Sequence, residues 1–174
     1  RRRYDSWLDV LPPGPPTRVS LELAFDRLGK DWPVLSDRLR VLRQLTFERL
    51  VVLDCAEQCE LSVVTGAMTA LAEFCLQQAL DQAWSEWTAV HGTPRTASGQ
   101  VARMWIMGMG KLGANELNVS SDIDLVYVHD EEGQTDGPRP IDNSAFFAKL
   151  ARSIQQLIGE TTEHGFVFRV DLAL

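Results

Sequence analysis

Hydrophobic residues recur every three or four positions through the first half of the chain, which is the pattern of helices that bury one face. The longest such pattern follows Ser62, a plausible N-cap. Its apolar positions are Val64, Ala67, Leu71, Cys75, Ala79, Ala83, Trp87 and Val90. Gly92 can end this helix in a left-handed conformation, and Pro94 follows it. We therefore predict that residues 17–95 form a helical region that ends in one long amphipathic helix.

Short hydrophobic runs rich in β-branched and aromatic residues replace the helical pattern after residue 99, and they indicate strands. The expected strands are Val101 to Met107, Ile123 to Val128 and Phe166 to Leu172. The acidic run from Asp130 to Pro140 predicts a solvated loop. Asp142 can cap a further helix, with Ile141 stapled onto Phe146. The order of helices, strand, loop, strand, helix and strand predicts an α+β fold.

Three regions follow from these changes of pattern. Residues 1–16 end in Pro12-Pro13-Gly14-Pro15-Pro16 and are expected to form an extended, Pro-rich lead. Residues 17–95 are the helical region, and residues 96–174 are a strand-containing core. The first residue is not Met and the last lies inside an expected strand, so we expect a piece of a longer chain whose core is truncated at its C-terminus.

Charge and composition narrow the classes of function. A net charge of -7 argues against a nucleic-acid partner, because binding the phosphate backbone requires a basic surface. No secretion signal is visible, and no uninterrupted apolar stretch approaches the length of a membrane span. We therefore expect a cytoplasmic protein without a membrane partner. Cys55, Cys59 and Cys75 are interpreted as buried, reduced thiols, since no histidine stands at a zinc-ligand spacing.

A glycine-rich segment follows the first predicted strand and is a candidate phosphate site. Gly108, Gly110 and Gly113 allow backbone N–H groups to approach phosphate oxygens, and Lys111 adds a positive charge. The alternative is that these glycines are only turn residues, because the segment lacks the full phosphate-loop pattern.

Two acids stand at the start of the second predicted strand. Asp122 and Asp124 are two residues apart, so both carboxylates face the same side of a strand. Such charges repel unless a cation neutralises them, and carboxylate oxygens suit Mg²⁺ or Mn²⁺. The alternative is that Asp122 caps a turn and Asp124 keeps an edge strand soluble.

A third acid, Asp171, interrupts the apolar pattern of the last predicted strand. A carboxylate there is costly unless it is exposed, paired or bound to metal. Arg169 lies on the same expected strand face and could pair with it instead. Three carboxylates on neighbouring strands can bind two metal ions that assist an in-line displacement at phosphorus. The residues alone thus indicate a candidate metal-assisted site for displacement at phosphorus, built from Asp122, Asp124 and Asp171.

A glycine turn, a D-x-D strand and a later acid-bearing strand resemble the nucleotidyltransferase superfamily that includes DNA polymerase beta. The string GMGKLGANELNVSSDIDLVYV, residues 108–128, resembles the bacterial glutamine synthetase adenylyltransferase/adenylyl-removing enzymes. It is most similar to their N-terminal, deadenylylase copy, which typically reads GKLG, ELN and SSDIDL. The chain departs from that family at Leu45, Thr46 and Leu53, which are usually charged residues, and at Ala173, which is usually an arginine.

This resemblance implies a polymerase-beta-like nucleotidyltransferase core, a small mixed sheet flanked by helices, that follows the helical region. It implies phosphorolytic removal of AMP from a tyrosine of glutamine synthetase, with release of ADP, in the control of nitrogen assimilation. It also implies Mg²⁺ or Mn²⁺ as the cofactor, and adenylylated glutamine synthetase, inorganic phosphate, an adenine nucleotide and the nitrogen-regulatory PII signal protein as partners. The implied phosphate or nucleotide contacts are Gly108, Gly110, Lys111, Gly113, Ser120 and Ser121.

Two other functions stay open at this point. One is ATP-dependent nucleotidyl transfer to glutamine synthetase or to another acceptor, which uses the same kind of site. The other is a non-catalytic regulatory docking module. The presence of all three acids argues against the docking module, because like charges without a metal would only destabilise the fold.

Overall fold

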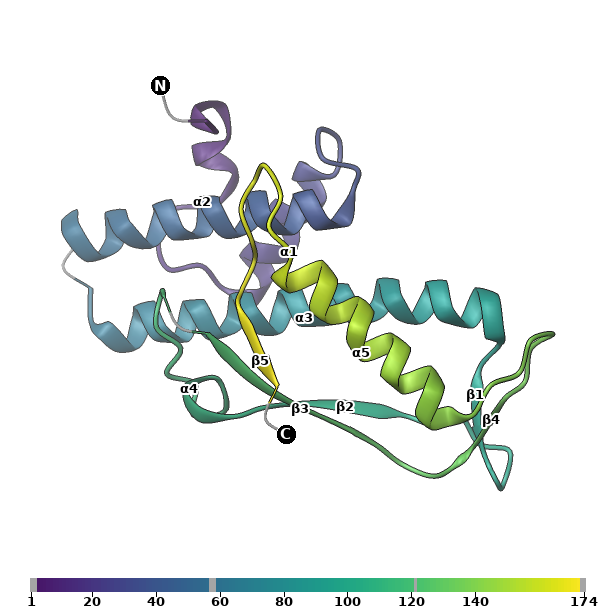
Figure 1. Cartoon of the computed structure of the whole chain (residues 1–174). Helices are drawn as coiled ribbons and strands as arrows, with labels where there is room; N and C mark the ends of the chain where they lie inside the picture. Colours follow the sequence, from purple (N-terminus) through teal and green to yellow (C-terminus); the bar gives the residue numbers. More distant parts are fainter. Residues whose placement is uncertain (1–2, 57–58, 121, 173–174) are drawn as a thin grey trace.

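The computed structural model describes residues 3–56, 59–120 and 122–172 (Figure 1). In chain order the elements are η1 (Asp5–Val10), α1 (Arg18–Leu28), α2 (Leu35–Ala56), α3 (Leu61–His91), β1 (Pro94–Thr96), β2 (Met104–Gly108), α4 (Gly110–Gly113), β3 (Ile123–His129), β4 (Gly133–Thr135), α5 (Asn143–Gly159) and β5 (Val170–Leu172). Helices dominate the first half and strands appear only in the second, which confirms the predicted α+β class.

The central helix is α3, and it packs against α1, α2 and α5. Its apolar side chains join one hydrophobic core that extends from Tyr4 to Phe168. Gly92 ends the helix at φ 82°, as the sequence predicts. The predicted start is wrong by two residues, because the N-cap is Glu60 and not Ser62, and Glu60 makes no side-chain capping bond.

Helix α3 is long and apolar. By length and composition alone, Leu61–His91 is long and apolar enough to cross a membrane, although Glu73 and Asp81 interrupt its apolar sequence. In the fold, 61% of its most apolar 18-residue window is buried. Packing against α1, α2 and α5 therefore accounts for most of this apolar surface.

The strands that carry the predicted acids form a three-stranded sheet in the order β2-β3-β5. β2 pairs with β3 in antiparallel fashion, and β3 pairs with β5 in parallel. The first and third predicted strands are shorter than expected. Strand β5 begins at Val170 and not at Phe166, because the N–H groups of Val167 and Phe168 both donate to the Ile158 carbonyl at the end of α5.

The prediction of a solvated loop over Asp130 to Pro140 is wrong for part of that segment. β4 pairs in antiparallel register with β1, and the side chain of Thr135 is buried. Asp136 accepts hydrogen bonds from the Thr93 N–H and from Arg95 Nε, both at 2.7 Å. The bond from Arg95 is the main cause of a lowered pKa of the Asp136 carboxyl. These polar contacts order the loop although its sequence is hydrophilic.

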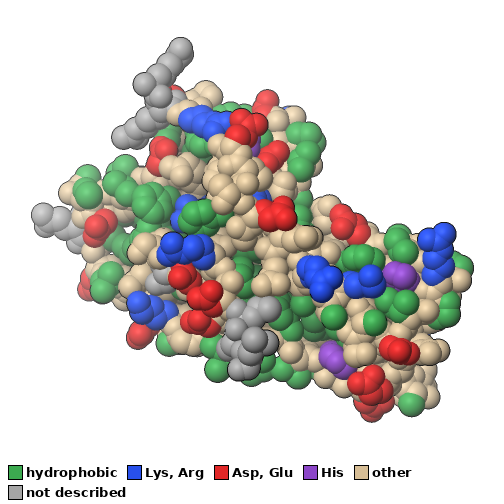
Figure 2. All heavy atoms as spheres, in the orientation of Figure 1, with side chains coloured by type: hydrophobic (Ala, Val, Ile, Leu, Met, Phe, Trp, Pro, Cys, Tyr) green, Lys and Arg blue, Asp and Glu red, His purple; other side chains and the backbone are tan. Residues whose placement is uncertain are grey.

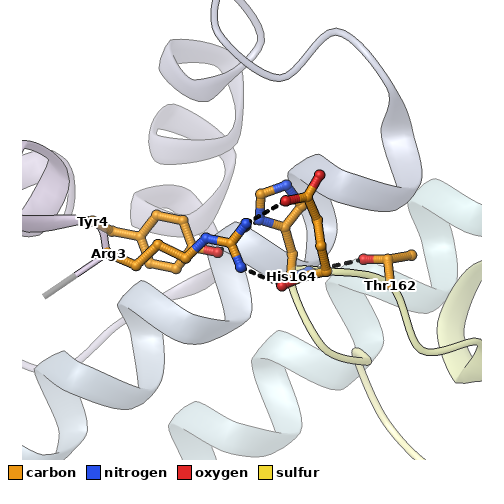
Figure 3. Close-up of polar contacts among 5 residues, drawn as sticks. Arg3, Tyr4, Thr162 and His164 are labelled. Carbon is orange, nitrogen blue, oxygen red and sulfur yellow. Dashed lines mark hydrogen bonds and ion pairs between the residues drawn. The ribbon is translucent and has the colours of Figure 1, made fainter.

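Residues 5–10 of the lead form a 3-10 helix, so the prediction of an extended segment is wrong there. The residues just before this helix dock on the turn that precedes β5 (Figure 3). Tyr4 is buried, and its hydroxyl lies 2.7 Å from Nδ1 of His164. Arg3 pairs with the Glu163 carboxylate at 2.6 Å, and the His164 N–H donates to the Thr162 hydroxyl. The lead therefore helps to hold the turn in place.

Several smaller expectations can also be compared with the structure. Cys75 is buried, and burial raises the pKa of its thiol to about 12, but Cys55 is exposed and Cys59 is only half-buried. Asp142 is the N-cap of α5 as predicted, although its carboxylate accepts from Gln134 and not from the helix. The division near residue 95 coincides with the change from helix to strand, and its interpretation as a domain boundary stays a prediction.

Candidate functional site

The two sides of the β2-β3-β5 sheet have different surroundings. Helices α3 and α5 lie on one side of the sheet (Figure 1), and Ile123 and Leu125 of β3 are both buried in the core. Side chains alternate along a strand, so Asp124 points to the opposite side, while Asp122 directly precedes the strand. Trp105 of β2, whose register partner is Val128, is half exposed on that side. Among the described residues, no helix covers this side of the sheet.

Two of the three predicted acids occupy neighbouring positions in the sheet. Asp124 is the register partner of Asp171 in the parallel pair β3–β5. Register partners in adjacent strands lie about 5 Å apart with side chains on the same side. Asp171 is exposed and Asp124 is partly exposed. Neither carboxylate has an ion pair or a side-chain hydrogen bond with another residue in the described part of the chain.

The remaining predicted acid, Asp122, pairs with the arginine that the sequence placed beside Asp171. Arg169 Nε donates to an Asp122 oxygen, and both side chains are largely exposed. The alternative pairing of Arg169 with Asp171 is therefore wrong. Arg169 precedes β5 and does not follow its alternation. A metal ion that binds Asp122 would have to compete with this guanidinium.

The glycine turn lies directly against Asp124. The Met109 N–H donates to the Asp124 carbonyl at 2.8 Å, which joins the turn to the start of β3. Gly110 adopts φ +53°, and a Cβ at this position would lie 3.1 Å from Asp124 Oδ2. A side chain at residue 110 would therefore be strained and would crowd the carboxylate. Two neighbouring glycines are required for packing, because a Cβ at Gly113 would lie 2.4 Å from the Gly108 carbonyl oxygen.

The remaining predicted phosphate contacts lie around the same end of β3. Lys111 and Ser120 are exposed, and Ser121 lies outside the described residues. In the space-filling view, acidic side chains gather between basic ones over α4 and the starts of β3 and β5 (Figure 2). A cavity of about 400 Å³ reaches Gly108 and Gly113 from between α3 and β2, on the helix-covered side, so the acids do not line it.

The residue types fit a divalent cation, but only in part. Carboxylate oxygens are the ligands that Mg²⁺ and Mn²⁺ prefer, and Asp124 and Asp171 lie side by side without another cation. Within residues 3–56, 59–120 and 122–172, no group of three His, Cys, Asp or Glu side chains is gathered closely enough to hold a metal. A two-carboxylate site at Asp124 and Asp171 thus fits as it stands, and Asp122 joins it only if Arg169 releases it.

Two arginines of α2 contribute to this region and were not predicted as site residues. Arg40 is almost fully buried, and it donates to the carbonyls of Gly165, Leu157 and Glu160 as well as to its own helix at Ser36. Burial lowers the pKa of its guanidinium. Arg43 lies beside Phe47, Phe166 and Phe168. The sequence did contain a signal for these two residues, because Arg40 and Arg43 both interrupt the apolar face of a predicted helix.

The sequence of this chain is similar to those of known proteins. Residues 17–174 match the family model described as glutamate-ammonia ligase adenylyltransferase. A protein of Ralstonia nicotianae is 46% identical over 80% of this chain, one of Bordetella pertussis is 48% identical over 78%, and one of Burkholderia mallei is 41% identical over 92%. Each is called a bifunctional glutamine synthetase adenylyltransferase/adenylyl-removing enzyme. The chain spans only 15%, 15% and 18% of their respective lengths.

The family model covers most of the chain, and the matched residues include the glycine turn, Asp124 and Asp171. The similarity therefore extends over both the helices and the acid-bearing sheet. The chain belongs to the glutamate-ammonia ligase adenylyltransferase family.

Proposed function

We propose that this chain provides the site for metal-dependent, phosphorolytic removal of AMP from a tyrosine of glutamine synthetase. The observation that carries the proposal is the pairing of Asp124 with Asp171 on the helix-free side of the sheet, with the glycine turn against Asp124. Two unpaired carboxylates side by side repel each other, so such a pair favours a site that binds a cation. The names of the relatives support glutamine synthetase as the protein substrate.

The reaction transfers the adenylyl group from a tyrosine to phosphate. An oxygen of inorganic phosphate forms a bond to the phosphorus of AMP, the bond from that phosphorus to the tyrosine oxygen breaks, and the tyrosine oxygen takes up a proton. The products are ADP and unmodified tyrosine. A divalent cation, when bound, supplies positive charge that offsets the negative charge of the phosphoryl oxygens.

The side chains around the glycine turn would position the reacting groups. Asp124 and Asp171 would hold the cation between neighbouring strands, and Asp122 would join them when it leaves Arg169. Because Gly110 has no side chain, phosphate oxygens can approach the backbone beside Asp124. Lys111, which is exposed on the same turn, would attract the negatively charged groups. The proposed catalysis is therefore mainly electrostatic and positional.

The test is phosphate-dependent release of ADP from adenylylated glutamine synthetase in the presence of Mg²⁺ or Mn²⁺. We expect Asp124→Asn and Asp171→Asn each to lower the rate by at least a hundredfold, since each removes a charge from the proposed site. Asp130→Asn is the matched control, because Asp130 follows the far end of β3 and its carboxylate accepts from the Arg103 N–H. Equal losses in the control and in the site variants would contradict the assignment of the acids.

The same assay separates the other functions. The relatives are named as enzymes that both add and remove the adenylyl group, so unmodified glutamine synthetase with ATP is the second arm. Incorporation of AMP that depends on Asp124, without phosphate-dependent ADP release, would replace removal by forward transfer. Absence of both activities, together with binding of glutamine synthetase, would favour a docking module.

A further inference from the structure

A small cavity lies beside the acids, at the end where β3 and β5 begin. Its volume is about 180 Å³. α2 contributes Arg43 and Phe47 to its wall, the segment before β3 contributes Ser120 and Asp122, and the segment before β5 contributes Phe166 and Arg169. None of these residues except Ser120 and Asp122 was predicted to belong to the site. The cavity thus joins the helical half of the chain to the acid-bearing sheet.

Arg43 is the unusual residue in this cavity. The centre of its guanidinium lies 5.2 Å from the ring of Phe166 and 5.9 Å from the rings of Phe47 and Phe168. Its Nε is buried without a hydrogen-bond partner, and no carboxylate among the described residues pairs with it. Burial lowers the pKa of this guanidinium, but an arginine stays protonated at neutral pH. The cavity therefore contains a partly buried positive charge that stacks on aromatic faces.

Other arginines that stack on phenylalanine in this fold have polar partners. Arg18 lies 5.0 Å from the Phe74 ring and also pairs with Glu22 at 2.8 Å. Arg38 lies 4.7 Å from the Phe25 ring and donates to the carbonyls of Trp32 and Pro33. Arg43 has the stacking without the polar partners. Because a desolvated cation favours an anionic neighbour, the missing partner of Arg43 is expected to be an anion.

The size and position of the cavity limit what the anion can be. Pockets for drug-sized ligands start at about 300 Å³, so 180 Å³ is too small for a whole nucleotide and suits one small ion or group. The Ser120 hydroxyl can donate to an oxygen, whereas the Asp122 carboxylate would repel one. Arg169 offsets that repulsion because it pairs with Asp122. The net charge of the wall is then set by Arg43.

We propose that this cavity binds one phosphate-class oxyanion, either free phosphate or the phosphoryl group of a nucleotide, with Arg43 as its principal cation. The proposal rests on the proposed function, since an anion beside the acids is a reactant only if this site performs phosphorolysis. It adds a residue from α2 to a site otherwise built from the sheet and the glycine turn. Two guanidinium N–H groups can contact two phosphate oxygens, which a lysine cannot do in the same geometry.

The experiment is calorimetric titration of the chain with inorganic phosphate, without metal and in a phosphate-free buffer. We expect Arg43→Met to weaken phosphate binding at least tenfold and Arg43→Lys to weaken it less. Arg18→Met is the matched control, because it removes a stacked arginine that does not line the cavity, and binding should stay unchanged. Phosphate binding that is equal in wild type and in a folded Arg43→Met variant, as judged by its melting temperature, would overturn the proposal.

Titrations with AMP and with adenosine identify the source of the anion. Binding of phosphate and binding of AMP should both depend on Arg43, and adenosine should not bind at this site. If phosphate alone binds, the site takes the free ion; if AMP alone binds through Arg43, it takes the nucleotide's phosphoryl group. Adenosine binding as tight as AMP binding would overturn an oxyanion site. Arg43-dependent phosphate binding in a chain that releases no ADP would contradict the proposed function only.

Discussion

Arg40 and Arg43 are three residues apart on α2, yet the regions around them are built in opposite ways. All hydrogen-bonded contacts of Arg40 go to backbone carbonyls, three of them at the end of α5 and in the turn before β5. The carbonyls of Leu157 and Glu160 belong to the end of α5, where a helix leaves its last acceptors unpaired. Arg40 therefore caps α5 from a neighbouring helix and fixes the route of the chain toward Asp171.

Arg43 faces the same C-terminal segment one turn further along, but its buried Nε has no hydrogen-bond partner among the described residues. The difference indicates two uses of a buried positive charge. Where the protein supplies every partner, the charge holds two elements together. Where the protein leaves a partner out, the charge is available to a ligand. The same contrast separates the helix-covered side of the sheet, which is packed, from the side that carries Asp124 and Asp171.

The largest effect that tests this contrast is expected at Arg40. Arg40→Met leaves several carbonyls without a donor, so we expect the free energy of unfolding to fall by about 3 kcal/mol. Arg43→Met removes only the contact with the aromatic rings, and we expect a loss of about 1 kcal/mol or less. Urea denaturation of the two variants measures both values. Equal losses would show that Arg43 is as structural as Arg40.

Sequence reasoning predicted most of the elements that local patterns specify. The apolar repeat located α3 and α5, and the glycine segment with Asp122 and Asp124 located the end of β3. Strands β1 and β4 were missed because each has only three residues and no apolar alternation, and their pairing joins positions about 40 residues apart. Such contacts depend on where α3 and α5 place the chain.

The site was predicted less completely for a related reason. Strand alternation placed Arg169 beside Asp171, but the segment before Val170 is tied to α5 and does not alternate. Arg169 therefore reaches Asp122 instead. The contribution of α2 was also missed, because the positions of Arg40 and Arg43 relative to the sheet depend on the packing between distant segments. Residues on the strands could be inferred from their spacing, whereas those on α2 could not.

A smaller effect is expected at the glycine turn, on the open side of the sheet. Gly110→Ala places a side chain at φ +53° and 3.1 Å from Asp124 Oδ2, so we expect a loss of about 1 to 2 kcal/mol in stability. Gly99→Ala is a useful control, since Gly99 also has a positive φ but nothing within 4 Å of the added Cβ. A greater loss at Gly110 than at Gly99 measures the crowding of Asp124, and equal losses would mean that backbone strain explains the whole effect.

The smallest effect is expected at the acids themselves, and it should have the opposite sign. Without a divalent cation, Asp124→Asn removes the repulsion between Asp124 and its neighbour Asp171. The free energy of unfolding should therefore rise by roughly 0.5 kcal/mol. Mg²⁺ or Mn²⁺ should raise the melting temperature of the wild type, and the variant should lose most of this shift because the cation no longer has two carboxylates. A variant that is less stable than the wild type without metal, and that still responds fully to metal, would show that Asp124 supports the fold as Arg40 does. A variant that is more stable without metal and that no longer responds to metal would establish that Asp124 serves ligand binding at a small cost in stability. That property distinguishes this side of the sheet from the packed side.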